Sequence, residues 1–239
     1  MMSAEERQVV VLAGGLGTRL RGLGGSLPKA LRPVAGRPFL EVMLAPLRAQ
    51  GFRRFHFCLG ALGDQLARHL DGLGPDLELA IEVEAAPCGT AGALLNSAAR
   101  LDEVFLLVMG DTYFEFDYGS LFKLLSDRAD GLLVVTNADS GVVPNVGLVA
   151  SLVTAYDKAG VEGGWVDTGV AVLRRRSLQA LGGECPPLDL GALFRRLIVR
   201  RSLGAVTTDR RFYDIGTPER YRGFDARLRA AGRDGTSPC

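Results

Sequence analysis

The sequence predicts an α/β fold in a single domain, with a doubly wound, mixed sheet and helices on both of its faces. Apolar runs of strand length alternate with helical patterns over the first 137 residues, which is typical of parallel strands joined by covering helices. The run 104–109 (VFLLVM) is apolar throughout, as expected for a strand at the centre of a sheet. A chain of 239 residues is also long enough to bury a large core in one domain.

The elements of the first part follow from periodicity and from their glycine boundaries. We expect strands at 9–12, 55–59, 77–83, 104–109 and 131–137, and helices at 39–50, 63–70, 90–99 and 118–128. Apolar residues stand at helical spacing in the first of these helices, which is expected to end before Gly51. The glycine turn Gly14-Gly15-Leu16-Gly17 follows the first strand directly.

The alternation becomes less regular after Ser140. Strands are expected at 146–152, 155–158, 166–173 and 212–215, with a helix at 188–199. A last helix is expected to begin at Thr217-Pro218-Glu219, with the threonine as N-cap and the proline in the first helical position. We therefore divide the single domain 1–239 into a regularly alternating half (1–137), a less regular part (138–230) and a tail (231–239).

Composition and charge exclude several classes of protein. The net charge of +1 gives no bulk attraction to nucleic acid or to an anionic membrane. No apolar run approaches the roughly 20 residues that span a bilayer, and the leader MMSAEERQ lacks the apolar region of a secretory signal. The four cysteines form no CxxC pair and the two histidines have no metal-ligand spacing. We expect free thiols and a cytoplasmic location, with no nucleic-acid or membrane partner.

The glycine turn after the first strand is the strongest local signal. A strand that runs into a glycine-rich loop is a common phosphate-binding structure. A dinucleotide fingerprint GxGxxG would need a third glycine where Leu20 stands, and a P-loop would need a glycine where Pro28 precedes Lys29. Neither a dinucleotide oxidoreductase nor a P-loop protein therefore fits this loop.

A third loop fits throughout. The motif LAGGLGTRL at 12–20 with PKALRPV at 28–34 resembles the opening motif of the sugar-1-phosphate nucleotidylyltransferases. The resemblance continues in order along nearly the whole chain, with EAAPCGTAGALL (84–95), GDTYFEFDY (110–118), AYDK (155–158), VDTGV (166–170) and FYDIGTPERY (212–221). Within the family, the chain is most similar to the D-glycero-D-manno-heptose 1-phosphate guanylyltransferases, closely followed by the mannose-1-phosphate guanylyltransferases. The resemblance implies the Rossmann-like mixed sheet of nucleotide-diphospho-sugar transferases, with a nucleotide-binding half at 1–137 and a sugar-phosphate-binding part at 138–230.

The family resemblance also implies a reaction and a set of site residues. A sugar 1-phosphate and a nucleoside triphosphate would form a nucleotide sugar and pyrophosphate, with Mg²⁺ as cofactor held by Asp111 and Asp214. Arg19 and Lys29 complete the catalytic set with these two aspartates. Nucleotide binding is implied for Leu12, Ala13, Gly14, Gly15, Gly17, Thr18, Arg19, Glu84, Gly89 and Thr90, and sugar-phosphate binding for Lys158, Asp167 and Gly147. Lys29 and Lys158 are two of only three lysines among 28 basic residues, a bias that suggests a need for a compact ammonium there.

The base can be argued from Glu84. A carboxylate only accepts hydrogen bonds, and guanine presents N1–H and N2–H₂ side by side as a matched pair of donors. Uracil and thymine offer one donor flanked by acceptors, and adenine offers one donor beside an acceptor. We therefore expect GTP, with ATP or UTP/dTTP as alternatives.

The sugar is less well specified. Asp167 stands where the family has asparagine, no tyrosine follows Gly169-Val170, and PNVG (144–147) lacks an aromatic residue before its glycine. D-glycero-D-manno-heptose 1-phosphate is the leading expectation, with a hexose 1-phosphate such as mannose 1-phosphate as the alternative. A non-catalytic sugar-nucleotide-binding regulator is a distant alternative. The resemblance also suggests a homodimer.

Overall fold

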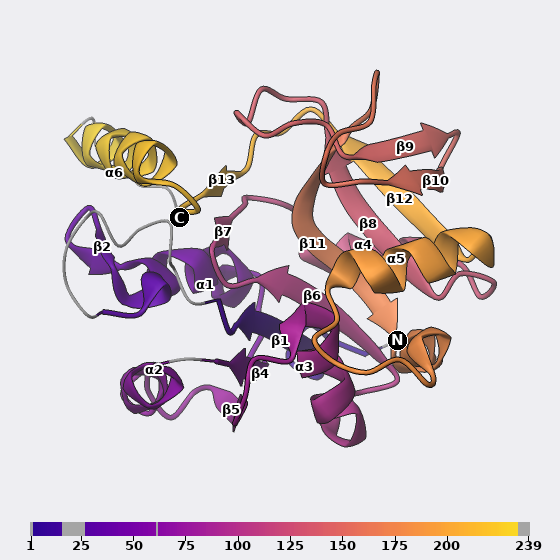
Figure 1. Cartoon of the computed structure of the whole chain (residues 1–239). Coiled ribbons are helices and arrows are strands. Elements are labelled where there is room, and N and C mark those ends of the chain that lie inside the picture. The colour runs from indigo at the N-terminus through magenta and orange to yellow at the C-terminus, as the bar shows by residue number, and fades with distance from the viewer. Residues whose placement is uncertain (1, 16–26, 61, 234–239) are drawn as a thin grey trace.

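The computed structural model describes residues 2–15, 27–60 and 62–233. A nine-stranded mixed sheet forms the centre of these residues (Figure 1). Its strands lie in the order β5 (Glu78–Val83), β4 (Arg54–Leu59), β1 (Gln8–Ala13), β6 (Val104–Met109), β11 (Val166–Arg174), β8 (Gly131–Thr136), β12 (Leu203–Thr208), β10 (Leu152–Tyr156) and β9 (Val146–Val149). The first four run parallel, and β8 runs parallel to β12. β11 is antiparallel to both of its neighbours, and β10 is antiparallel to β9 and β12.

Helices cover both faces of the sheet, because successive residues of a strand point to opposite faces. Val9 and Val11 of β1 pack into one apolar cluster, and Val10 and Leu12 into a second. The first cluster is covered by α1 (Phe39–Ala49), α2 (Gly63–Leu70), α4 (Tyr118–Leu124) and α6 (Pro218–Arg233), and the second by α3 (Gly89–Ser97), α5 (Leu190–Val199) and the 3₁₀ segment η4 (Arg175–Leu181). The predicted fold class, a doubly wound mixed sheet in one domain, is confirmed.

Short elements bring distant segments to the carboxyl ends of the parallel strands. The 3₁₀ turn η2 (Lys29–Leu31) precedes a small hairpin of β2 (Pro33–Val34) and β3 (Arg37–Pro38). β7 (Thr112–Tyr113), just after β6, pairs antiparallel with β13 (Tyr213–Asp214). A further 3₁₀ turn, η3 (Ala98–Arg100), follows α3. The β7–β13 pair therefore carries the last part of the chain back to the end of β6.

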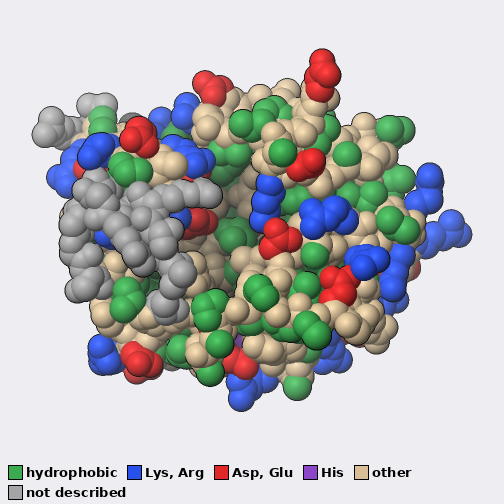
Figure 2. All heavy atoms as spheres, viewed as in Figure 1, with side chains coloured by type: hydrophobic (Ala, Val, Ile, Leu, Met, Phe, Trp, Pro, Cys, Tyr) green, Lys and Arg blue, Asp and Glu red, His purple; other side chains and the backbone are tan. Residues whose placement is uncertain are grey.

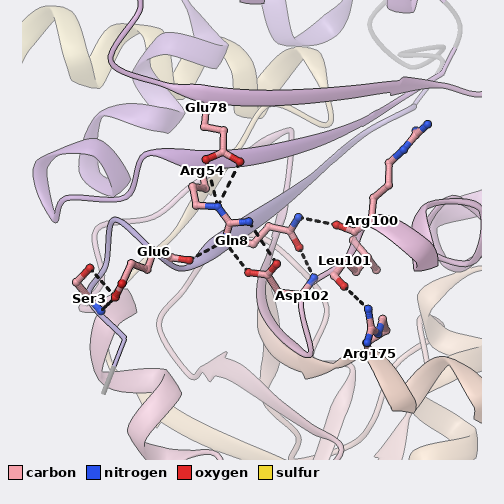
Figure 3. Close-up of polar contacts among 9 residues, drawn as sticks. All are labelled: Ser3, Glu6, Gln8, Arg54, Glu78, Arg100, Leu101, Asp102 and Arg175. Atoms are coloured by element: carbon pink, nitrogen blue, oxygen red, sulfur yellow. Dashed lines mark hydrogen bonds and ion pairs between the residues drawn. The ribbon is translucent and has the colours of Figure 1, made fainter.

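A polar network fixes the opposite edge, where the parallel strands begin (Figure 3). Arg54 at the start of β4 pairs with Asp102 at 2.8 Å and with Glu78 of β5 at 3.4 Å, and donates to the backbone oxygen of Glu6 at 2.6 Å. The side chain of Gln8 donates to the Arg100 carbonyl and accepts from the Asp102 amide. These contacts hold the starts of β1, β4 and β5 in register, on the side away from the glycine turn.

Several element boundaries differ from the expectations. The segment 146–152 is not one strand: a turn at Ala150, whose φ is +53°, separates β9 from β10. The strand expected at 155–158 ends at Tyr156, and the helix expected to reach 128 ends at Leu124. α5 begins at Leu190 because the Asp189 carboxylate caps it, accepting from the Ala192 amide at 2.9 Å.

Two features of the second half were not expected. β12 was missed altogether, and β8 of the first half lies between β11 and β12 of the second. α6 extends to Arg233, so the start of the expected tail at 231 is helical, and residues 234–239 lie outside the described residues. In the part of the chain that the structure describes, no helix is long and apolar enough to cross a bilayer.

Candidate active site

Two cavities lie at the carboxyl ends of the parallel strands, where open α/β sheets bind ligands. The smaller has a volume of about 310 Å³ and is lined by Leu12, Ala13, Gly14, Gly15, Glu84 and Gly89 among others. The larger has a volume of about 480 Å³ and is lined by Lys158, Asp167, Asp214 and Arg220 among others. Lys29, Thr90, Met109 and Asp111 line both cavities. In the space-filling view, the surface is hollowed between the side that carries α6 and the side that carries β9 and β10 (Figure 2).

An ion pair lies where the two cavities meet. Lys29, in η2, places its Nζ 2.5 Å from Oδ2 of Asp111, which follows the end of β6. The lysine side chain is 15% exposed and the aspartate side chain 34% exposed. The pair is therefore accessible from both cavities, and it joins two residues that are far apart in the sequence.

Asp214 reaches the same point through the β7–β13 pairing. The Ile215 amide donates to the Asp111 carbonyl at 3.1 Å, which fixes the end of β13 beside Asp111. One oxygen of Asp214 accepts from the Gly216 amide at 2.7 Å, and the other from Nη1 of Arg220 at 2.8 Å. Burial raises the pKa of Asp214, and the neighbouring Asp111 charge raises it further, while Gly216 and Arg220 act in the opposite direction.

The two aspartates fit a magnesium site that is completed by substrate. In the residues that the structure describes, no cluster of three or more His, Cys, Asp or Glu side chains could hold a metal by itself. Asp111 and Asp214 nevertheless line one cavity, and the Asp111 charge raises the pKa of Asp214. Mg²⁺ is commonly bound by one or two carboxylates together with phosphate oxygens and water. The donor set therefore fits Mg²⁺ brought in with a phosphate-bearing ligand.

Glu84 lies in the smaller cavity, and one of its oxygens is already engaged. Oε2 accepts from the Cys88 amide at 3.2 Å and from the Cys88 thiol at 2.6 Å. Burial and the Glu84 carboxylate raise the pKa of the Cys88 thiol to about 11, so the thiol keeps the proton that it donates. Oε1 faces the backbone of Gly60: a Cβ on Gly60 would lie 2.7 Å from Oε1 and 2.3 Å from the Gly14 carbonyl oxygen. The absence of a side chain at Gly60 thus keeps space beside Oε1.

The loop after Glu84 is tied to the start of α5. Gly89 has a φ of +77°, and a Cβ there would lie 2.3 Å from the carbonyl oxygen of Leu188. That carbonyl accepts from the Ala91 amide at 2.9 Å, and the Leu190 amide donates to Oγ1 of Thr90 at 2.9 Å. This contact explains why a glycine stands at position 89, and it places Thr90 between the two cavities.

The buried carboxylate of Asp167 lies in the larger cavity. Its Oδ2 accepts from the Tyr156 hydroxyl at 2.9 Å and its Oδ1 from the Gly169 amide at 2.9 Å. Burial raises the pKa of Asp167. Its backbone amide donates to the side chain of Asn145, which also lines the cavity. Asp167 therefore lines the cavity with a carboxylate held in place by Tyr156 and Gly169, and its role in sugar-phosphate binding stays a prediction.

The other two residues expected on the sugar side differ in their placement. Lys158 lines the larger cavity, with its Nζ 2.8 Å from Asp189 and its side chain 59% exposed. Gly147 lies in β9 and is not among the described residues that line either cavity. Its role in sugar-phosphate binding stays a prediction without support from the geometry.

Some expected residues are outside the described ranges, and some site residues were not expected. Gly17, Thr18 and Arg19 fall between residues 15 and 27, so their roles stay predictions. Sequence reasoning missed the partner residues of the site, namely Cys88, Tyr156, Asp189 and Arg220. Asp189 could have been found as an N-cap before an apolar helical pattern.

Residues 9–181 match the model of the MobA-like NTP transferase domain. The chain belongs to this family. A putative mannose-1-phosphate guanyltransferase of Sulfolobus acidocaldarius is 26% identical over 92% of this chain, which spans only 62% of that relative's length. The D-glycero-alpha-D-manno-heptose 1-phosphate guanylyltransferase of Campylobacter jejuni is 23% identical over 91% of this chain and 98% of its own.

Solved structures agree with this assignment. The crystal structure of HddC from Yersinia pseudotuberculosis has a TM-score of 0.80 at 26% identity, covering 93% of this chain and 99% of its own. A second crystal structure of HddC is a complex with GMP-PN and has a TM-score of 0.78. The predicted family and the predicted enzyme class, a sugar-1-phosphate nucleotidyltransferase, are thereby confirmed.

Proposed function

We propose that this chain transfers a guanylyl group from GTP to D-glycero-D-manno-heptose 1-phosphate with the help of Mg²⁺, giving a GDP-sugar and pyrophosphate. The observation that carries the proposal is the pair of cavities that meet at Lys29 and Asp111. A reaction between two bound phosphates needs two adjoining pockets, with charged groups at their junction. The smaller cavity would take the nucleotide, and the larger the sugar 1-phosphate.

The chemistry needs orientation and charge neutralisation more than proton transfer. A phosphate oxygen of the sugar 1-phosphate forms a bond to the α-phosphorus of GTP while the bond to the β-phosphate oxygen breaks, and pyrophosphate leaves. The attacking phosphate is already ionised near pH 7, so no general base is required. Lys29, at the junction, would hold the attacking phosphate and the α-phosphate together and offset their repulsion.

Other groups would also offset the negative charge of the phosphates. Asp111 and Asp214 would hold Mg²⁺, which when bound supplies positive charge to the phosphates. The backbone amides at 14–18 and the Arg19 side chain would bind the triphosphate, as the family resemblance implies. Lys158 would bind the phosphate of the sugar. A Lys158 ammonium that lies 59% exposed and pairs with one carboxylate can turn toward an incoming phosphate.

Glu84 supports the choice of GTP. Its position in the smaller cavity, with Oε2 held by Cys88, gives a fixed carboxylate that can accept but not donate. Guanine is the base that presents adjacent N–H donors to such a group. The guanylyltransferase names of the relatives and the GMP-PN complex of HddC point the same way.

The sugar assignment rests on similarity together with one buried acceptor. The Campylobacter relative is named for the heptose phosphate, and it matches this chain over nearly its full length. Asp167 would accept a hydrogen bond from a hydroxyl group of the sugar. Mannose 1-phosphate is the second candidate, because the Sulfolobus relative carries that name.

A direct assay tests the proposal. The purified protein is mixed with Mg²⁺, one of five nucleoside triphosphates and a panel of sugar 1-phosphates, with pyrophosphate release as the readout. The expected result is release with GTP and the heptose phosphate, and its loss in Asp111→Asn. Release only with another triphosphate would contradict the assigned role of Glu84. Nucleotide binding without release for any pair would favour a non-catalytic binder.

A further inference from the structure

We infer that Arg220 is a further substrate-binding residue, which would bind the phosphate of the sugar 1-phosphate and which pairs with Asp214, one of the two carboxylates that would hold Mg²⁺. The inference rests on the proposed function, because it assigns a role within the same site. It adds to that function a residue that neither the motifs nor the relatives assign.

The fold places Arg220 at the site through a short, well-anchored segment. Thr217 caps α6, and its Oγ1 accepts from the Arg220 amide at 3.3 Å. Arg220 thus stands in the first turn of α6, six residues after Asp214 at the end of β13. Its side chain returns toward β13, and Nη1 lies 2.8 Å from Oδ2 of Asp214. The side chain is 29% exposed, while that of Asp214 is 11% exposed.

The guanidinium has hydrogen-bonding capacity left over. An arginine side chain carries five N–H donors in a planar fork. Only Nη1 forms a hydrogen bond with the residues that the structure describes. A Cβ added at Gly216 would lie 3.5 Å from Nη2. The donors of Nη2 and Nε have no hydrogen-bond partner among the described residues, and they belong to a side chain that lines the larger cavity.

The cavity that Arg220 lines identifies its ligand. Lys29 lines both cavities, as a residue at the junction should, whereas Arg220 lines only the larger one among the described residues. Lys158, which like Arg220 lines only the larger cavity among the described residues, belongs to a different part of the fold, after β10. A phosphate bound between Lys158 and Arg220 would meet cations from two sides. Arginine matches phosphate oxygens in a bidentate manner, which lysine cannot do.

The pairing of charges explains why the arginine faces Asp214. Asp111 is paired with Lys29 and Asp214 with Arg220, so each carboxylate of the candidate metal site has one cation partner. A partly buried carboxylate without a partner would be costly. Mg²⁺ held by the two carboxylates would supply the positive charge that these partners give, which would leave the Arg220 guanidinium able to bind the phosphate.

The test compares Arg220→Ala and Arg220→Lys with Arg222→Ala, which removes an exposed arginine of the same helix. In the pyrophosphate assay, we expect Arg220→Ala to raise the KM for the sugar 1-phosphate about 10- to 100-fold, the effect of losing hydrogen bonds to a charged group. The KM for GTP should stay within about twofold, and Arg220→Lys should give an intermediate KM, because it keeps the charge but not the fork. An unchanged KM for the sugar phosphate in Arg220→Ala would overturn the inference.

Metal binding provides the second readout, with Mn²⁺ alone and no substrates, followed by the loss of the free-ion signal in electron paramagnetic resonance. Arg220→Ala should bind Mn²⁺ as tightly as the unmodified chain or up to about fivefold more tightly, because a competing ion pair of modest strength is gone. If Arg220 serves only to hold Asp214 in place, Mn²⁺ binding will weaken, and this outcome overturns the inference.

Calorimetric titration of each substrate alone separates the two proposals. Mannose 1-phosphate and the heptose phosphate should bind about 10- to 100-fold more weakly to Arg220→Ala than to Arg222→Ala, with GTP binding equal. A protein that shows this pattern yet never releases pyrophosphate would contradict the proposed function and support the role of Arg220. Equal sugar-phosphate binding by both variants would contradict the role of Arg220 whatever the activity.

Discussion

Replacing Glu84 with glutamine should change the base that the enzyme prefers, and the structure gives the reason. Oε2 accepts from the Cys88 amide and thiol, so the glutamine carbonyl oxygen must take that position to keep both hydrogen bonds. The new NH₂ group then takes the position of Oε1, beside the backbone of Gly60, in a side chain that lines the smaller cavity. A donor would replace an acceptor on the side chain that is proposed to bind the base.

The size of the effect follows from the hydrogen bonds that are lost. Guanine N1–H and N2–H₂ would face an amide N–H instead of a carboxylate oxygen. A hydrogen bond to a charged group contributes about 1.5–3 kcal/mol, which corresponds to roughly 10- to 100-fold in kcat/KM. Bases with an acceptor at this position lose nothing by the exchange. We therefore expect Glu84→Gln to lower kcat/KM for GTP about 10- to 100-fold and to narrow the gap to UTP and ATP.

The assay is pyrophosphate release with each triphosphate at a fixed concentration of sugar 1-phosphate. Glu78→Gln, at the start of β5 and 72% exposed, is the matched control and should leave kcat/KM unchanged. Denaturant unfolding of both variants checks that the fold is retained. A Glu84→Gln variant that folds normally and keeps the full preference for GTP would refute the assignment of Glu84 to the base.

Three further changes have expected outcomes. Lys29→Ala should lower kcat/KM by about 100-fold or more, because it removes a preorganised cation at the junction of the two cavities. Lys123→Ala, which removes an exposed lysine, should leave kcat/KM unchanged. Equal activity of the two variants would rule out a catalytic Lys29. Gly89→Ala should lower the free energy of unfolding, measured in urea, by about 1–3 kcal/mol or more, because the φ there is +77° and the new Cβ would lie 2.3 Å from a carbonyl oxygen. Gly223→Ala in α6, where the new Cβ meets open space, should not lower the free energy of unfolding. Burial raises the pKa of Asp167 in the folded chain, so the folded state binds the proton more tightly than the unfolded state. The contribution of Asp167 to stability therefore falls as the pH rises from about 3.9, the usual pKa of an aspartate, through the raised pKa, and it is constant above that value. The stability of Asp167→Asn relative to the unmodified chain should therefore increase over that window in urea titrations at several pH values, and a difference that does not vary with pH would contradict a raised pKa.

The sequence was informative where one strand supplies both the fold and the chemistry. Gly14 and Asp111 each follow an apolar run, and the carboxyl ends of parallel strands meet at one edge of the sheet. That rule alone places the glycine turn beside Asp111, and the structure has β1 and β6 as neighbours. Glu84 follows the same logic at the end of β5, since its amide donates to the Leu59 carbonyl at the end of β4.

The parts that could not be predicted depend on pairings between distant segments. β12 contains Gly204 and two threonines, so its apolar pattern is weak, and it becomes a strand only because it pairs along its whole length with β8. The antiparallel insertion of β11 between β6 and β8 leaves no local trace. The partners of Glu84 and Asp167, which are Cys88 and Tyr156, follow from side-chain geometry rather than from spacing.

Some expectations remain as they were. The division of the domain at residue 137 describes ligand-binding parts, and it stays a prediction, although in the sheet the two parts interlock through β8. The cytoplasmic location and the homodimer also stay predictions. The roles of Gly17, Thr18 and Arg19, which lie outside the described residues, also stay predictions.

The charges at the site would couple the binding of metal and substrate. Lys29 pairs with Asp111 and Arg220 with Asp214, so the fold keeps both carboxylates paired through its own side chains. A metal held by these carboxylates would compete with the two cationic groups for the same oxygens. Phosphates bound by Lys29 and Arg220 would relieve that competition, and a bound metal would in turn leave the two groups able to bind phosphate. Such coupling is reciprocal by linkage. Each phosphate substrate should therefore tighten the binding of the metal by the same factor by which the metal tightens the binding of that substrate.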